Sequence, residues 1–139
     1  MQIMLRVLGQ EHPDTLIAMN GLAGAYQSVG QVTAAASLYE KILEISNRTF
    51  GEEHPETLNI MNGLAAALHA LGKETEAAKL HEILVERRTK VLGLEHPDTM
   101  KSVSDLASAY SRLGQTAAVG QLIMQQLQVR ARKDSHLET

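Results

Sequence analysis

Three copies of one heptapeptide decide how the rest of the chain is read. The first is Gly9-Gln10-Glu11-His12-Pro13-Asp14-Thr15, followed by Gly51-Glu52-Glu53-His54-Pro55-Glu56-Thr57 and Gly93-Leu94-Glu95-His96-Pro97-Asp98-Thr99. Each copy begins 42 residues after the previous one. Because a fixed period of this length is typical of stacked helical repeats, the heptapeptide predicts a series of equivalent structural units.

The same register holds outside the heptapeptide. Leu-Ala pairs begin at positions 22, 64 and 106, and glycines follow at 30, 72 and 114. We therefore divide the chain into repeat units at 9–50, 51–92 and 93–134, with a tail at 135–139. Residues 1–8 align with the last residues of a unit, so we expect them to be the end of a preceding repeat helix in a longer array.

Each repeat unit is predicted to contain two helices. Pro13 suits the first helical turn, where its missing N–H is not needed, and Asp14 lies near the positive end of the helix dipole. Apolar residues then recur at helical spacing as far as Gly30, a residue type that often follows a helix end. By this register we expect helices near 13–29, 32–49, 55–71, 74–91, 97–113 and 116–132.

The fold class that follows is all-α, a superhelix (solenoid) of three helical hairpins with a partial leading helix. One hairpin of this size cannot bury its apolar faces alone, whereas stacked hairpins bury them against each other. The chain of 139 residues is 44% hydrophobic and only 3% aromatic, which also favours packed helices over sheets.

Composition and charge narrow the class of function. The chain has no Cys, which excludes disulfides and Cys-ligated metals, and we expect a cytoplasmic protein. A net charge of −3 with no basic stripe argues against nucleic acid as a partner. No apolar run reaches the length of about 20 residues that a membrane-spanning helix needs, so we expect no membrane partner either.

No pattern of catalytic or cofactor-binding residues emerges. The sequence lacks a P-loop, a dinucleotide-binding glycine motif, a nucleophile elbow and a zinc-protease motif, so we predict that it is not an enzyme and holds no cofactor. The periodic histidines His12, His54 and His96 lie too far apart to share a metal ion, because neighbouring helices pack about 8–10 Å apart. We predict that they are structural residues of the turns between units. The basic stretch 87–90 is interpreted as a solvated helix face.

The heptapeptide, continued as Gly-x-Glu-His-Pro-acid-Thr-Leu with Met-Asn-x-Leu-Ala after it, resembles the 42-residue form of the tetratricopeptide repeat, and most of all the repeats of kinesin light chains. Similar repeats also occur in NB-ARC-type signalling ATPases. The match is uneven, because Leu68 and His81 replace aromatic residues and Val119 replaces a small one. The second helix of the last unit is also rich in Gln, which is typical of a degenerate or capping element.

The resemblance implies that the first helix of each unit lines a concave groove that binds a protein or peptide. Asn20 and Asn62 match positions where the family carries Asn, and an Asn side chain both donates to and accepts from a peptide backbone. Small residues at 24, 66 and 108 would leave room for the ligand. The predicted partner-binding residues are Asn20, Gly24, Gln27, Asn59, Asn62, Ala66, His69, Lys101, Ser104, Ser108 and Arg112.

Three alternatives remain open at the level of the sequence. The predicted groove residues also fit a solvated polar helix face. The apolar residues Ile3, Leu5 and Leu8 would let the end of the array pair with another copy, giving a homo-oligomer or a purely structural segment. The chain also fits a ligand-sensing segment of a larger NB-ARC-type ATPase.

Overall fold

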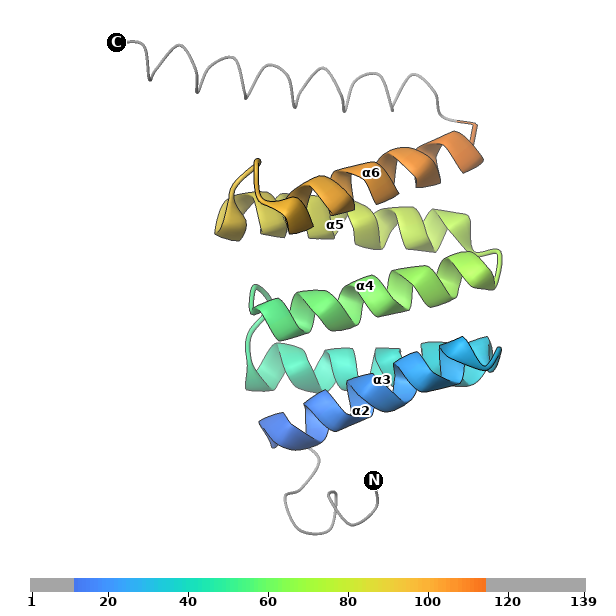
Figure 1. Cartoon of the computed structure of the whole chain (residues 1–139), viewed down its shortest axis with the longest axis vertical. Helices are drawn as coiled ribbons and strands as arrows, with labels where there is room; N and C mark the ends of the chain where they lie inside the picture. The colour runs from blue at the N-terminus through green and yellow to red at the C-terminus, as the bar shows by residue number, and fades with distance from the viewer. Residues whose placement is uncertain (1–11, 115–139) are drawn as a thin grey trace. The chain divides into compact units, whose positions relative to one another are not determined.

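A computed structural model describes residues 12–114, and this part of the chain consists of α-helices joined by short turns (Figure 1). The helices are α2 (Pro13–Ser28), α3 (Val32–Thr49), α4 (Pro55–Ala70), α5 (Glu74–Leu92) and α6 (Pro97–Arg112). Their bounds agree with the predicted helices to within one residue at each end. The all-α class is therefore confirmed. The leading segment 1–8, the predicted helix near 116–132 and the tail 135–139 lie outside the described residues.

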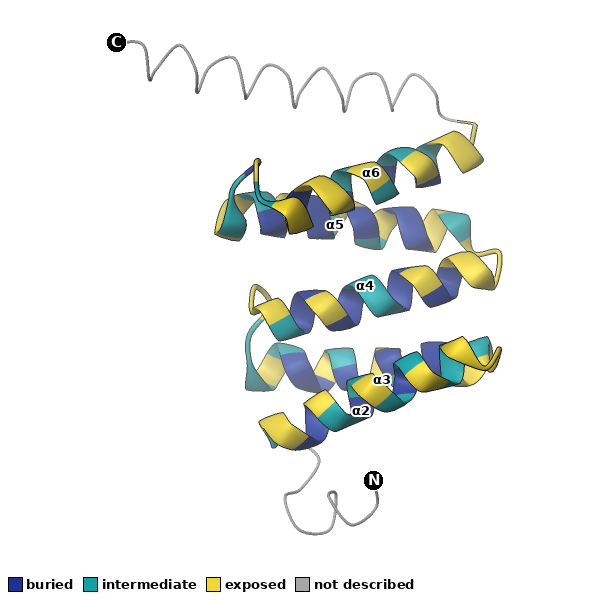
Figure 2. Cartoon of the chain, viewed as in Figure 1, coloured by how far each residue is buried: buried dark blue, intermediate teal, exposed yellow. Residues whose placement is uncertain are grey.

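The chain divides into two compact parts, one ending at Leu80 and the other starting at His81. In the N-terminal part, α3 packs against both α2 and α4, and α2 also touches α4. The buried side chains come from one face of each helix, with the beginning of α5 added (Figure 2). This core contains Leu16, Met19, Ala23, Ala35, Ala36, Tyr39, Ile42, Ile45, Ile60, Leu64, Ala67, Leu68 and Ala77.

A histidine begins each of the three first helices. The imidazole Nδ1 atoms of His12, His54 and His96 accept hydrogen bonds from the backbone N–H groups two residues later, at 3.1, 3.0 and 3.1 Å. The following Pro occupies the first helical turn, and an acidic residue comes next. Because the first N–H groups of a helix have no partner inside it, this bond stabilises the helix start. The prediction that these histidines are structural is confirmed.

Glycine ends the first helices in the same repeated way. Gly30 and Gly72 have φ values of 86° and 81°, in the left-handed region that favours glycine. The N–H of Gln31 donates to the Tyr26 carbonyl at 2.8 Å, and the N–H of Lys73 donates to the Leu68 carbonyl at 2.8 Å. These bonds form the Schellman motif, which turns the chain directly into the second helix.

The aromatic ring of Tyr39 occupies space that a missing side chain leaves on α4. A Cβ added to Gly63 would lie 2.5 Å from the Tyr39 Cζ, far closer than two carbon atoms can approach. Tyr39 is only 5% exposed, and burial raises the pKa of its hydroxyl. At the equivalent position of α2, a Cβ added to Gly21 would meet nothing within 4 Å. The glycine is therefore required at one position of the repeat and not at the other.

Gly63→Ala should destabilise the N-terminal part by about 1–3 kcal/mol, the usual cost of overpacking. Gly21→Ala is the matched control and should stabilise by up to about 1 kcal/mol, because alanine has the higher helix propensity. Urea unfolding followed by circular dichroism measures both. Equal effects of the two substitutions would contradict the packing of Tyr39 against Gly63.

His54→Ala should lower the free energy of unfolding by about 1 kcal/mol, because the Glu56 N–H loses its acceptor. His54→Asn should recover most of that loss, since Asn is among the best N-capping residues. The His54 ring also stacks on Phe50, with centroids 4.5 Å apart. If Asn were no better than Ala in denaturant unfolding, the stacking rather than the cap would be the stabilising contact.

Candidate partner-binding face

The predicted binding residues of the N-terminal part form two parallel rows on neighbouring helices. Their spacing of three or four residues places each row on one side of its helix. None of them belongs to the fully buried core, and Asn20, Gly24, Gln27 and Asn62 are partly buried, whereas Asn59, Ala66 and His69 are exposed. We call this set the amide stripe: Asn20, Gly24 and Gln27 on α2 with Asn59, Asn62, Ala66 and His69 on α4.

Asn20 is tied to the next repeat by its side chain. Its Nδ2 atom donates a hydrogen bond of 3.2 Å to the Oε1 atom of Glu56, which lies in the first turn of α4. This contact was not predicted from the sequence, where Asp14, the equivalent of Glu56 in the first unit, was explained by the helix dipole. Nothing in one repeat unit signals it, because Asn20 and Glu56 belong to successive units.

The small residues of the stripe have different surroundings. A Cβ on Gly24 would lie 3.7 Å from the Tyr39 hydroxyl, which is ordinary contact, so an alanine fits there. Ala66 is exposed on α4. Gly24 therefore lies beside the Tyr39 hydroxyl, whereas Ala66 lies on an exposed part of α4.

The His69 side chain is partly exposed and also has a partner within the protein. Its Nδ1 atom pairs with the Glu74 carboxylate, which lies at the beginning of α5. The His69 side chain is 47% exposed, and that of Glu74 is 19% exposed. This pair is the charged end of an otherwise neutral stripe.

The predicted residues on α6 belong to the C-terminal part and differ in charge from the amide stripe. Lys101, Ser104, Ser108 and Arg112 are all exposed. The Lys101 Nζ lies 3.8 Å from the Asp105 Oδ2, one helical turn further on. Tyr110 donates a 2.5 Å hydrogen bond to Glu82, and burial together with this carboxylate raises the pKa of Tyr110 to about 12.

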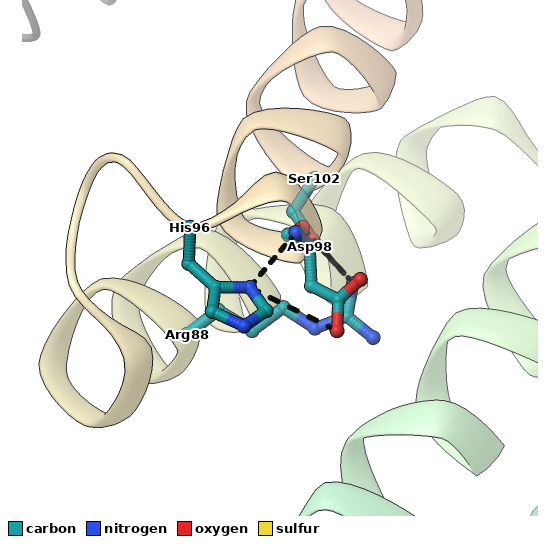
Figure 3. A network of polar contacts seen from close by, with 4 residues as sticks. All are labelled: Arg88, His96, Asp98 and Ser102. Atoms are coloured by element: carbon teal, nitrogen blue, oxygen red, sulfur yellow. Dashed lines mark hydrogen bonds and ion pairs between the residues drawn. The ribbon is translucent and has the colours of Figure 1, made fainter.

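The interpretation of residues 87–90 as a solvated face is wrong for Arg88, which is only 5% exposed. Its guanidinium donates to the Ser102 Oγ at 2.7 Å and to the Asp98 carbonyl at 3.4 Å (Figure 3). Burial lowers the pKa of Arg88, and the charges of Asp98 and Asp105 oppose that effect. Arg88 is therefore a structural residue of the contact between α5 and α6.

The equivalent contact between α3 and α4 uses other side chains. Ser46 takes the place of Arg88, and its hydroxyl lies 2.7 Å from the hydroxyl of Thr57. Ile60, fully buried, takes the place of Ser102. The first contact thus has a small hydroxyl and a large apolar residue at the two positions where the second contact has a large cation and a small hydroxyl.

Ser102→Ile should destabilise the C-terminal part by about 3–5 kcal/mol, because it leaves the buried guanidinium without its hydroxyl partner. The double variant Arg88→Ser with Ser102→Ile reproduces the pair found at the first contact and should recover most of that loss. Thermal unfolding of the two single variants and the double variant measures the coupling. Additive effects would show that Arg88 and Ser102 do not compensate for each other.

The described residues offer little support for other kinds of site. Residues 12–114 contain no group of three or more His, Cys, Asp or Glu side chains placed to hold a metal ion. Within the same residues, no helix has both the length and the apolar character needed to cross a bilayer. An open hollow at the turn between α3 and α4 is lined by Asn47, Phe50, Gly51, Glu52, Glu53 and His54, away from the amide stripe.

A family model described as Tetratricopeptide repeat matches residues 14–82 and 59–119, which together cover more than half of the chain. Among solved structures, the Podosopora anserina protein with kinesin light chain nearly identical TPR-like repeats is 37% identical, with a TM-score of 0.87. That alignment covers 94% of this chain and 62% of the other. A point variant of the same protein is 35% identical, with a TM-score of 0.76 and coverage of 96% and 63%.

BtubC (BKLC) from P. vanneervenii is 19% identical, with a TM-score of 0.80 and coverage of 96% and 53%, and it supports the fold alone. A search of curated protein sequences finds no match. The chain spans less than two thirds of the length of these three solved chains. The predicted resemblance is confirmed by the family match, the helical hairpins and the shared repeats: the chain belongs to the tetratricopeptide repeat family, and its repeats are similar to those of the kinesin light chain type.

Proposed function

We propose that this chain is a non-catalytic protein-interaction module and that the amide stripe binds an extended segment of a partner protein. Tetratricopeptide repeats in general mediate contacts between proteins. The observation that carries the finer proposal is the pairing of two neighbouring helices, α2 and α4, whose partly exposed faces both present side-chain amides beside small residues.

The chemistry of the stripe suits a peptide main chain. An extended segment carries alternating N–H and C=O groups, and both need partners when a protein surface covers them. Asn20 and Asn62 each carry amide donors and an acceptor on a short side chain. Gly24 and Ala66 keep the surface low between them, so a main chain can approach the amides closely.

Charge supports the same class of ligand. The stripe has no lysine, arginine or aspartate, and its one histidine is already paired with Glu74. A surface without strong charges gains little from a charged ligand side chain. We therefore propose that the stripe recognises the backbone and small neutral side chains of its partner.

The double variant Asn20→Ala with Asn62→Ala should weaken peptide binding about fivefold to 150-fold, because two hydrogen bonds of about 0.5–1.5 kcal/mol each are lost. The probe is a peptide selected from a random display library on the wild-type chain, and isothermal titration calorimetry gives the dissociation constants. Glu40→Ala is the control, because Glu40 is exposed on α3, a second helix.

Circular dichroism should show that the double variant keeps its helical content, so that lost binding is not lost folding. Binding of the selected peptide at full strength by the double variant would overturn the assignment of the stripe. Loss of binding by Glu40→Ala instead would move the site to the faces of the second helices.

A further inference from the structure

The hydrogen bond between Asn20 and Glu56 does more than join two helices, because it selects one of two orientations of the Asn20 amide. A side-chain amide can be rotated by half a turn so that its nitrogen and oxygen exchange places. A carboxylate is an acceptor only, so it pairs with the NH2 group and repels the carbonyl oxygen. The Nδ2 atom of Asn20 is the one that faces Glu56, at 3.2 Å.

Glu56 is itself held in place by the start of α4. The backbone N–H of Glu56 donates to His54 Nδ1 at 3.0 Å, and Pro55 fixes the first turn. The Glu56 side chain is partly buried beside α2, where it can hold its charge near the positive end of the α4 dipole. The backbone of Glu56 is thus fixed, and its carboxylate is placed by the bond to the Asn20 amide.

The Oδ1 atom of the Asn20 amide can still accept a hydrogen bond. Within residues 12–114, no hydrogen bond to the Asn20 Oδ1 is found, and this oxygen is not among the buried polar atoms that lack a partner. Because the nitrogen and oxygen lie on opposite arms of one planar group, fixing Nδ2 on Glu56 turns Oδ1 away from that carboxylate. The amide then presents an acceptor on the stripe.

We infer that Glu56 is a positioning residue for the amide stripe: it fixes the Asn20 amide so that Oδ1 accepts a hydrogen bond from a backbone N–H of the bound segment. This inference rests on the proposed function of the stripe. It adds a requirement on the ligand: the partner must offer a hydrogen-bond donor, and not an acceptor, beside the residues of the stripe on α2. A ligand shifted by one main-chain group would place a carbonyl against Oδ1 and be rejected.

A purely structural role makes a different prediction. If the bond only holds α2 against α4, its loss lowers the stability of the N-terminal part and leaves the choice of ligand unchanged. The substitutions Glu56→Gln and Asn20→Asp distinguish the positioning role from the structural role. Glutamine at 56 can donate or accept, so it releases the amide of Asn20 to adopt either orientation.

The double variant Asn20→Asp with Glu56→Gln exchanges the donor and the acceptor. The glutamine NH2 then donates to one aspartate oxygen, and the second aspartate oxygen takes the place of the Asn20 Oδ1. An outward acceptor is therefore kept although both residues are changed. This variant should recover the binding that Glu56→Gln alone loses.

The first measurement uses the free protein and needs no ligand. In nitrogen–proton NMR spectra, the two protons of the Asn20 NH2 group should be more widely separated than those of a free amide, because one of them is hydrogen-bonded to a carboxylate. Asn20→Ala identifies the pair of signals by their loss. In Glu56→Gln the separation should shrink; an unchanged separation would overturn the positioning role.

The second measurement uses the peptide selected from the display library, with single backbone N-methylations that remove one N–H at a time. For the wild type, one methylation near the α2 row should weaken binding about twofold to tenfold, as the loss of one hydrogen bond predicts. The same methylation should have less effect on Glu56→Gln and its full effect on the Asn20→Asp with Glu56→Gln variant. Equal sensitivity of all three proteins would overturn the inference.

The two proposals fail in different ways. If Asn20→Ala binds the peptide as tightly as the wild type, the proposed function of the stripe is wrong, and the requirement for a ligand donor falls with it. If Asn20→Ala weakens binding but Glu56→Gln changes neither the NMR signals nor the methylation profile, the amide stripe still binds the peptide and the positioning role of Glu56 is wrong.

Discussion

The histidine cap at the start of each first helix is the interaction on which the other contacts depend. An imidazole nitrogen accepts the N–H that the helix itself cannot satisfy, and the proline that begins the helix sets the direction of the first turn. The position of every later side chain on that helix follows from where it begins. On α4, the cap at His54 holds the backbone of Glu56, and Glu56 in turn reaches the Asn20 amide on α2. A local hydrogen bond in a turn thus determines what a distant face presents.

Much of this could be predicted from the sequence, because the repeat reports the same local chemistry three times. The proline and glycine positions located the described helices to within a residue, and the repeated histidines were predicted to be structural residues of the turns. Contacts between successive repeats were harder to predict. The burial of Arg88 depends on Ser102, and the orientation of Asn20 depends on Glu56, which is 36 residues away. Neither pair shows a signal within one repeat, and a charged residue such as Arg88 is ordinarily exposed.

Equivalent contacts are filled by different side chains on nearly the same backbone. Tyr39 packs against Gly63, where no Cβ can be accommodated, whereas the corresponding positions in the next repeat hold His81 and Asp105. Ser46 and Ile60 correspond in the same way to Arg88 and Ser102. Volume is kept for the pair rather than for the position, as close packing requires, whereas polarity differs between the equivalent pairs. The repeated residues therefore define the path of the backbone. The side-chain pairs at these contacts define how each helix packs against the first helix of the next unit.

The Arg88–Ser102 pair also limits how such an array can grow by tandem duplication of its gene. Copying residues 51–92 as a block would set Arg88 of the first copy against Ile60 of the second, and a buried guanidinium would lose its hydroxyl partner. Copying 61–102 instead, a block of the same length, keeps each Arg88 followed by its own Ser102. Breakpoints within the first helices are thus tolerated where breakpoints at the turns are not. The boundary of the unit that evolution can duplicate differs here from the boundary of the unit that folds as a hairpin.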